Sequence, residues 1–453
     1  MRPFWGARGW GGYTREGFMQ EQEKRGGLFA SPNYKWYIVG MLWFMAFFNY
    51  ADRQALASVL PLIQTEFDLN KEQLGMLTAA FAWVYGLGAP FAGYVVDRVR
   101  RKTAILAGLH AWSIICMATA ASTKFPHLVI FRALEGLGET FYFPASMSLV
   151  SDYHGKKTRS RAMGIHQTSV YAGTIGGGFF AGLIGQYWGW RWSFIIFGAL
   201  GVLLGLILHK LVLEPERGAA DFADTGIKTT AVSQGMSVRD TARLIFTTPT
   251  TLFLLGAFLC ANFVGAVMLA WMPTYLYEKF NLSLTGAGFT AVFYLQVASM
   301  IASPLGGWMA DSLRRKMFGG RMLVQAIGVL CGAPFVYLCG MTQSLSVLIG
   351  VLACWGFCKG LYDANIFASI YDVIPANARG TAAGLMNCIG WLAGAGTAPI
   401  IVGRIADQYD LGTAIALTSG VYLLAGVILI AGALFFIKRD SVRLHAKLAN
   451  TEQ

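Results

Sequence analysis

The chain has 453 residues, of which 55% are hydrophobic and only 13% are charged, and its mean hydropathy is +0.51. A soluble protein carries about 25% charged residues, so the apolar excess indicates a surface that faces lipid rather than a large water-soluble core. The net charge of +12 would suit nucleic acid in a soluble protein, but the basic residues gather in short loops, as in membrane proteins, so no nucleic-acid partner is expected.

The chain begins with a polar segment of mixed composition. Residues 1–34 combine arginine, glutamate, glycine and aromatic residues, and they lack the apolar core and cleavage site of a signal peptide. We expect this segment to be a flexible cytosolic tail.

Twelve apolar segments follow, each close to the roughly 20 residues that a membrane-spanning helix needs. Their predicted starts lie near Trp36, Gln73, Thr103, Pro126, Arg161, Trp192, Thr250, Leu284, Met322, Ser344, Thr381 and Gly412. The connections are short except for the polar segment 214–247, which divides the spans six and six. We therefore predict two six-helix bundles (35–213 and 248–438), a cytosolic inter-bundle loop (214–247) and a cytosolic C-terminal tail (439–453).

The charges of the loops predict the orientation of the chain. The loops after the second, fourth and eighth segments and the C-terminal segment are rich in Lys and Arg, whereas loops of the other parity lean acidic. By the positive-inside rule, both termini and the long loop lie in the cytosol. The seven cysteines fall in apolar runs without metal-ligand spacing, so neither disulfides nor a metal site is expected. The predicted fold class is an all-α integral membrane protein.

The two predicted bundles are related by an internal repeat. The stretch GYVVD, which ends at Asp97, recurs as GWMAD, which ends at Asp311, at an offset of 214. Gly164 in RAMGIHQ pairs with Gly384 in RGTAAGLMN at an offset of 220. Two matches at nearly one offset indicate two homologous halves, as in transporters that rock one half against the other around a midplane site.

Ionisable residues lie inside two segments of the first half. A charge at the bilayer centre is costly, so such residues are usually paired, buried and functional. Asp52 and Arg53 are adjacent in sequence but about 100° apart on a helix, so they can point at different neighbours. The alternative is a buried pair that only fixes packing. Arg132, Glu135 and Glu139 form one stripe of the fourth segment, in which Glu135 is expected to be the partner of Arg132.

Polar residues in the fifth and eleventh segments are further candidates. His166, Gln167 and Tyr171 stand in a glycine-rich run, and at the offset of 220 Gln167 corresponds to Asn387, four residues before Trp391. Symmetric amides suit a polyhydroxylated solute between the halves. For His166, a hydrogen-bonded packing role is the alternative to a functional one.

The tenth segment carries a second charged pair. At the same offset Glu139 corresponds to Lys359, which lies four residues before Asp363, so the two can form an ion pair of either structural or functional importance. Asn365 and Ser369 lie on an adjacent face within reach of a solute. Further candidates for a pocket lining are isolated polar residues of the seventh and eighth segments: Asn262, Tyr294 and Gln296.

The stretch GYVVDRVRRK resembles the loop signature of the major facilitator superfamily, and the resemblance covers residues 35–438. The stretches NYADR, FRALEGLGETFYFPAS, SRAMGIHQTSVYAGTIGGG and GWRWSF are similar to the anion:cation symporter branch, which includes bacterial sugar-acid transporters and animal vesicular anion transporters. NYADR and GLGE are also similar to the spinster branch, which handles lysolipids and sphingosine phosphate.

The resemblance implies a gating role for the loop signature. In the family its charges pin the cytosolic ends of neighbouring helices when the transporter faces outward, which assigns this role to Asp97, Arg98 and Arg101 and to the second-half copy at Asp311. Plain topogenic charge is the alternative. Ser312 stands where the first half has Arg98, so we expect the second clamp to be weaker.

The resemblance also implies roles for the charges inside the membrane. Asp52 and Glu139 match proton-coupling positions, and Arg53 matches the residue that faces the carboxylate of the substrate. The complete set of substrate-binding candidates is Arg53, Arg132, His166, Gln167, Tyr171, Ser369, Asn387 and Trp391.

The expected function is proton-coupled uptake of a small organic anion, a sugar acid such as a hexuronate or an aldonate, by alternating access. We expect a monomer in the lipid bilayer of a bacterial inner membrane, with no cofactor beyond the coupling ion H⁺, for which Na⁺ stays open. The alternatives are a spinster-like lysolipid carrier and an integral membrane enzyme. No catalytic set stands at a membrane face and no GxxxxGK[ST] motif is present, so we expect neither an enzyme with catalytic residues nor a nucleotide-driven pump.

Overall fold

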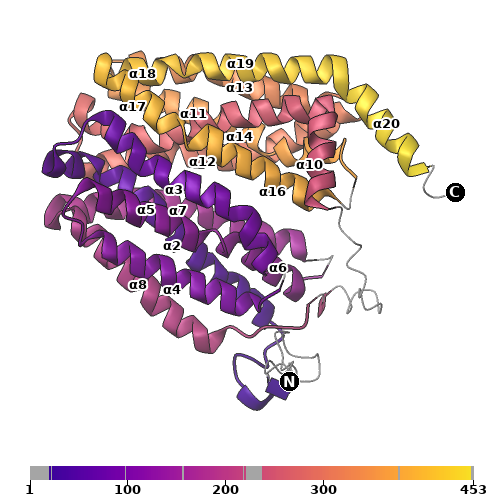
Figure 1. Cartoon of the computed structure of the whole chain (residues 1–453), viewed down its shortest axis with the longest axis horizontal. Helices are drawn as coiled ribbons and strands as arrows, with labels where there is room; N and C mark the ends of the chain where they lie inside the picture. The colour runs from indigo at the N-terminus through magenta and orange to yellow at the C-terminus, as the bar shows by residue number, and fades with distance from the viewer. Residues whose placement is uncertain are drawn as a thin grey trace, which may run out of the picture.

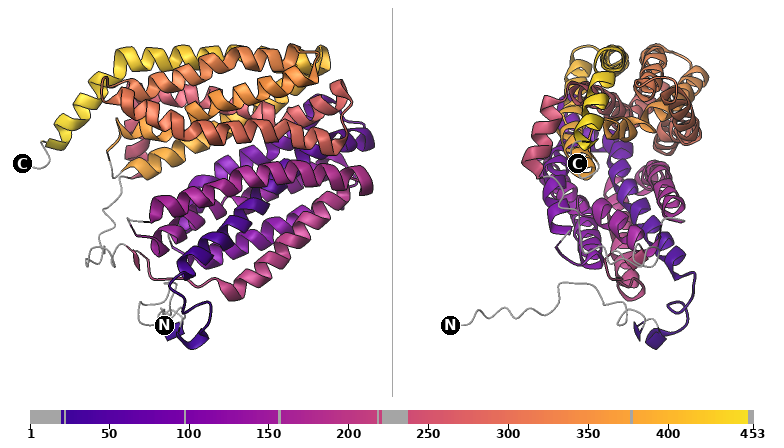
Figure 2. Two further views of the ribbon diagram at one scale, coloured as in Figure 1. Left: turned by 180° about the vertical axis from the view of Figure 1, so that it is seen from behind. Right: turned by 90° about the vertical axis from the view of Figure 1, so that its right-hand side faces the viewer.

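The computed structural model describes residues 20, 21, 23–96, 98–155, 158–217, 219, 220, 237–375 and 378–449. Most of the predicted N-terminal tail and the middle of the predicted inter-bundle loop lie outside these ranges. The described residues form helices arranged as two bundles side by side, the N-terminal half in indigo to magenta and the C-terminal half in orange to yellow (Figure 1). A view from behind shows the same two bundles (Figure 2).

The predicted segments agree closely with the helices, because a helix begins within two residues of every predicted start. The N-terminal half contains α2 (Tyr34–Phe67), α3 (Lys71–Val96), α4 (Arg101–Thr119), α5 (Phe125–Glu139), α6 (Tyr142–Tyr153), α7 (Arg159–Trp188) and α8 (Trp190–Leu211). The C-terminal half contains α11 (Pro249–Phe280), α12 (Leu284–Arg314), α13 (Gly320–Met341), α14 (Leu345–Asp363), α15 (Ile366–Tyr371), α16 (Arg379–Ile389), η2 (Gly390–Ala395), α17 (Ala398–Gln408), α18 (Leu411–Leu417), α19 (Ser419–Ala431), η3 (Gly432–Phe436) and α20 (Ile437–Ala449).

Nine helical segments in the described part of the chain are long and apolar enough to cross a membrane. The three other long segments, namely α2, α5 with α6, and α7, are not among the nine. Two of these three carry the ionisable residues of the first half, which lower their hydropathy. The number of twelve spans and the cytosolic side of the termini therefore stay predictions.

Two segments break at corresponding places in the two halves. The fourth segment breaks between α5 and α6 directly after Glu139, and the tenth breaks between α14 and α15 directly after Asp363. The eleventh segment contains the π-helical turn η2, an irregularity that is frequent at functional sites. All three irregularities lie beside the charged or aromatic residues that form the site described below.

Two predicted irregular segments contain helix. Residues 238–247 of the predicted inter-bundle loop form α10 (Val238–Thr247), which begins after an N-cap in which the Ser237 hydroxyl accepts a hydrogen bond from the Asp240 amide. The predicted C-terminal tail largely continues as α20, which has Asp440 in its first turn. The Asp440 carboxylate accepts hydrogen bonds from the amide and hydroxyl of Thr250 and so ties α20 to the start of α11.

The two halves meet at the end of the bundles that is distant from the start of α2 and from α20 (Figure 1). The Asp407 carboxylate accepts hydrogen bonds from the amides of Lys71 (2.8 Å) and Glu72 (2.9 Å), so the C-terminal half caps the first turn of α3. Gln186 accepts hydrogen bonds from the amide and hydroxyl of Thr285 and so caps α12 in the pseudo-symmetric way. These hydrogen bonds across the interface hold the two halves together and so close this end of the molecule.

Glycines let the helices approach at the same interface. Gly178 of α7 and Gly288 of α12 face each other so closely that a Cβ on either would overlap the carbonyl of the other. Gly177 likewise lies against the backbone of Ala51 in α2, so the glycine run of α7 serves close helix packing.

Candidate functional site

A cavity of about 300 Å³ lies between the two halves, at the lower end of the size range of small-molecule sites. Its polar and aromatic lining comes from both bundles and includes Tyr50, Arg53, Phe81, Arg132, Asn262, Lys359, Asp363, Tyr362 and Trp391. Of the predicted substrate-binding residues, Arg53, Arg132 and Trp391 are therefore brought together here.

Arg53 is the centre of the N-terminal side of the cavity. Its Nε forms an ion pair with the Glu139 carboxylate of α5, which is completely buried. Four aromatic rings surround the guanidinium at 4.6–5.7 Å from its carbon atom: Tyr50, Phe81, Tyr85 and Trp391. Cation–π attraction and one carboxylate thus hold the guanidinium in place, while its Nη1 has no hydrogen-bond partner among the described residues.

Arg132 and Glu135 form a second buried ion pair on α5. The Arg132 Nη1 donates to the Glu135 carboxylate at 2.5 Å, as the sequence predicted, and the guanidinium lies over Phe81. The Arg132 Nε has no hydrogen-bond partner among the described residues. Each arginine of the site is therefore paired with a glutamate of α5, and each retains donor capacity.

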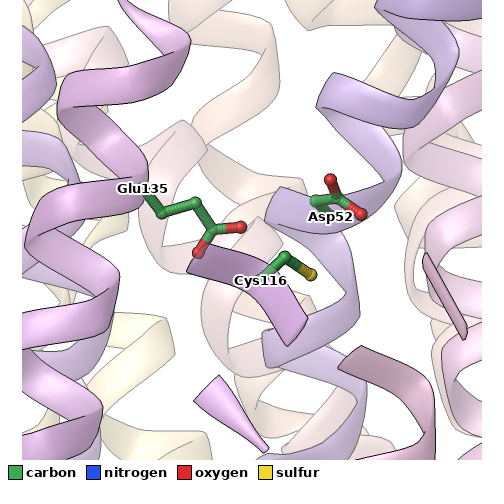
Figure 3. A group of neighbouring side chains, drawn as sticks. All are labelled: Asp52, Cys116 and Glu135. Carbon is green, nitrogen blue, oxygen red and sulfur yellow. The ribbon is translucent and has the colours of Figure 1, made fainter. Parts of the chain in front are cut away.

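Asp52 points away from Arg53, as helix geometry predicted. Its carboxylate lies with the Glu135 carboxylate and the Cys116 thiol in the space between α2, α5 and α4, where one ligand-type atom of each lies within 4.8 Å of the others (Figure 3). Asp52 is buried, and neither of its oxygens has a hydrogen-bond partner among the described residues. Among the described residues, these three side chains form a group that could hold a metal ion, whereas the sequence analysis expected no metal site.

The C-terminal side of the cavity carries the predicted Lys359–Asp363 ion pair. The Lys359 Nζ donates to the Asp363 carboxylate one turn further along α14, and both residues line the cavity. Tyr171 of α7 lies close enough to interact electrostatically with both members of the pair. The Asn262 side-chain amide donates to the Phe258 carbonyl, and Asn262 also lines the cavity.

Several predicted substrate-binding residues do not line the cavity in this conformation. The buried Ser369 accepts a hydrogen bond from Gln325 at 2.5 Å, and the neighbouring Asn365 donates to the carbonyls of Gly306 and Leu361. Asn387 is half-buried and Gln167 is exposed, both outside the lining.

His166 also lies outside the cavity lining. Its Nε2 donates to the Tyr142 hydroxyl at 3.0 Å, because that hydroxyl itself donates to the Leu42 carbonyl at 2.6 Å. The ring of His166 is buried against Tyr142, which is the packing arrangement weighed as the alternative to a functional role.

The loop signature of the first half is described only in part. Asp97 lies outside the described residues. Arg98 donates to the Tyr94 carbonyl and covers its ring. Arg101 is buried and forms ion pairs with Asp152 and with Glu214 (3.3 Å). It therefore ties the start of α4 to the end of α6 and to the segment that follows α8.

The second-half signature has a pairing that the sequence analysis missed. Asp311 accepts from Arg321 at 2.9 Å, and Arg321 also bonds to Asp372 at 2.8 Å, which in turn pairs with Arg314. Asp372 corresponds to Asp152 at the repeat offset of 220, so the internal repeat could have identified Asp152 and Asp372 as candidate partners of the basic residues. The aromatic cage of Arg53 was also missed, because its rings come from three different helices.

Comparisons with known proteins agree with this arrangement. The model of the Major Facilitator Superfamily matches residues 42–300 and 276–452. The D-galactonate transporter of Escherichia coli O6:H1 is 26% identical over 418 residues, which cover 87% of this chain and 95% of that protein. The protein named "Probable galactarate/D-glucarate transporter GudP" of Bacillus subtilis is 27% identical over 397 residues, which cover 82% of this chain and 86% of that protein.

The solved structures show the same fold. A bacterial homolog of the human lysosomal transporter Spinster, crystallised in an inward-facing and unoccupied conformation, matches with a TM-score of 0.75 and 22% identity. The match covers 91% of this chain and 98% of that one. At this identity the likeness shows the fold alone.

Proposed function

Because this chain belongs to the major facilitator superfamily and is a multi-pass membrane transporter, we propose that it takes up a small sugar acid together with protons. The observation that carries the proposal is the Arg53 guanidinium, which lies at a cavity between the halves, is held by four aromatic rings and one buried carboxylate, and keeps an unused N–H group. A guanidinium binds carboxylates through two parallel hydrogen bonds, so an organic acid suits this position.

Glu139 can link the binding of an anion to the uptake of a proton. Separating Arg53 from an ionised, fully buried Glu139 would leave an uncompensated charge, a loss that costs roughly 3–5 kcal/mol. Protonation of Glu139 removes this cost and frees the Arg53 Nε for the substrate. The anion and the proton would then bind together, which is the requirement of a symporter.

Asp52 is the second proposed proton site. A buried carboxylate is disfavoured in its charged form, so we propose that Asp52 holds a proton while water is excluded from it. The Glu135 carboxylate beside it increases that preference, because two negative charges would repel each other at this distance. Water reaching Asp52 in another conformation would allow the proton to leave.

The names of the relatives support a sugar acid as the substrate. One is named for an aldonate, which has a single carboxylate, and the other for aldarates, which have two. The lining residues Asn262, Tyr50 and Tyr362 can meet hydroxyl groups of such a solute. No cofactor is part of the proposal, and the protein would act as a monomer in a bacterial inner membrane.

Sodium is a second candidate for the coupling ion, favoured by one observation. Asp52 and Glu135 offer carboxylate oxygens that converge on one space, and hard cations prefer oxygen ligands. A lysolipid cargo, as in the spinster branch, is the alternative substrate class.

Transport by purified protein in liposomes tests the proposal. We expect radiolabelled galactonate or galactarate to accumulate when the outside is acidic, and a protonophore to abolish the accumulation. A sodium gradient at equal pH is the matched control and should drive no accumulation. Accumulation driven by sodium alone would contradict proton coupling, and binding of lysophospholipid without uptake of either sugar acid would contradict the substrate class.

A further inference from the structure

The Lys359–Asp363 pair has no part in the function proposed above, yet both residues line the same cavity as Arg53. Arg53 lies on α2 in the first half, whereas Lys359 lies on α14 in the second half. The cavity therefore has a cation on each side of the interface between the bundles. Ionisable residues inside a membrane protein are costly and usually serve transport, so a cation on the second-half side of the cavity calls for a role.

The partner of Lys359 differs in one respect from the partners of the two arginines. The side chains of Glu139 and Glu135 are completely buried, whereas the Asp363 side chain is 38% exposed and that of Lys359 is 21% exposed. Because Asp363 is open to the cavity, it can become hydrated when it leaves its cation, at a smaller cost than either fully buried glutamate. Lys359 can thus exchange Asp363 for a carboxylate of the substrate without a proton.

Building on the proposed function, we infer that Lys359 binds a second carboxylate and that the preferred substrate is a dicarboxylic sugar acid. One carboxylate binds Arg53 of the first half, and the carboxylate at the other end of the carbon chain binds Lys359 of the second half. Asp363 holds the ammonium group in place while the cavity is empty. A substrate with one carboxylate would leave the Lys359–Asp363 pair closed and would bind one half only.

Binding of a dianion would also favour closure of the transporter. A dianion that joins α2 to α14 bridges the two bundles, so its binding energy favours the conformation in which both cations reach it. A monoanion lacks the second attachment and supplies less of this energy. Selectivity for the dianion would therefore appear in the transport rate as well as in affinity.

Galactarate and galactonate form a matched pair of probes, since they differ only in a terminal carboxylate in place of a hydroxymethyl group. Binding to the purified full-length protein and uptake into liposomes would be measured for both. We expect the unaltered protein to bind galactarate at least about 10-fold more tightly, the value of one charge-assisted hydrogen bond. In Lys359→Gln the loss for galactarate should exceed the loss for galactonate by about 10- to 100-fold.

Three further variants separate recognition of charge from a structural role. Lys359→Arg should restore most of the preference for galactarate. Asp363→Asn should increase affinity for galactarate more than for galactonate, because it frees the lysine, and it carries the test if Lys359→Gln fails to fold. Lys279→Gln removes a lysine that is bonded to Tyr275 and lies outside the cavity lining, and it should leave the ratio of the two affinities unaltered.

The outcomes distinguish the inference from the proposed function. Equal losses for both acids in Lys359→Gln, or an Asp363→Asn protein with an unaltered ratio, would overturn the role of Lys359. Proton-driven uptake of galactonate without a preference for galactarate would overturn the inference and leave the proposed function standing. If neither acid is bound or taken up, the proposed function itself fails.

Discussion

Two ion pairs of the cavity, one in each half, share one corresponding position of the repeat and differ in burial and in the placement of acid and base. Glu139 and Lys359 are related by the repeat offset of 220, so an acid in the first half corresponds to a base in the second. The Arg53–Glu139 pair has a completely buried acid, whereas the Lys359–Asp363 pair is open to the cavity. A buried acid must take up a proton before its partner can leave, because an unpaired charge would otherwise stay buried. An acid that is open to the cavity can lose its partner and become hydrated instead. Under the proposed function, the first half is thus linked to protons, whereas the second half would recognise charge without them.

The largest expected effect follows from the removal of Arg53. The Arg53→Ala variant should bind either sugar acid at least about 100-fold more weakly, because two charge-assisted hydrogen bonds are lost. Arg53→Lys, which keeps the charge but not the planar fork, should recover only part of the affinity. Calorimetric titration of the purified protein measures both. Normal binding by Arg53→Ala would show that the first half does not hold the carboxylate.

The second prediction compares the acids of the two pairs. Glu139→Gln should lower the accumulation driven by a pH gradient by at least about 10-fold. Substrate exchange without a gradient should continue, because exchange needs no net proton movement. Asp52→Asn should behave in the same way. Asp363→Asn should still respond to the gradient, whatever its affinity. Loss of the response in Asp363→Asn, with the response kept in Glu139→Gln, would reverse the assignment of the two halves.

A smaller effect is expected at the aromatic contact between the halves. Trp391 comes from the second half but lies 5.7 Å from the Arg53 guanidinium of the first. Trp391→Leu should weaken binding by about 3- to 10-fold, the range of a partly desolvated cation–π contact. Trp391→Phe, which keeps an aromatic face, should recover most of the loss in the same titration. Equal affinities of the Leu and Phe variants would show that only the volume of the ring matters.

The smallest effect concerns the caps that join the halves at the closed end. Asp407 caps α3 with a charged carboxylate and two hydrogen bonds, whereas Gln186 caps α12 with a neutral amide. Asp407→Ala should destabilise the closed end by about 1–2 kcal/mol and Gln186→Ala by about 0.5–1 kcal/mol. The midpoint of thermal unfolding in lipid nanodiscs measures this order. A larger shift for Gln186→Ala would contradict it.

Much of the site was predictable from local spacing. Helix geometry separated Asp52 from Arg53, and a spacing of three residues joined Arg132 to Glu135, because both relations depend only on the 3.6-residue turn. The same spacing rule predicted the Lys359–Asp363 pair. The pairing of Arg321 with Asp311 and Asp372 was missed, since it depends on how α13 packs beside α12 and α15 rather than on any spacing along one helix.

The sequence by itself determined that this is a two-half helical membrane protein, because apolar length, loop charge and an internal repeat are properties of the chain alone. It also determined which side chains are ionisable within the apolar segments. Only the tertiary structure decided the environment of each charge. It enclosed Arg53 among rings from three helices of both halves and buried Asp52 beside Glu135 and Cys116. It also placed Ser369 and His166 away from the cavity and opened Asp363 to it. The physical reason is that burial and partners arise where helices from distant parts of the chain meet, and a charge costs or contributes energy according to those neighbours.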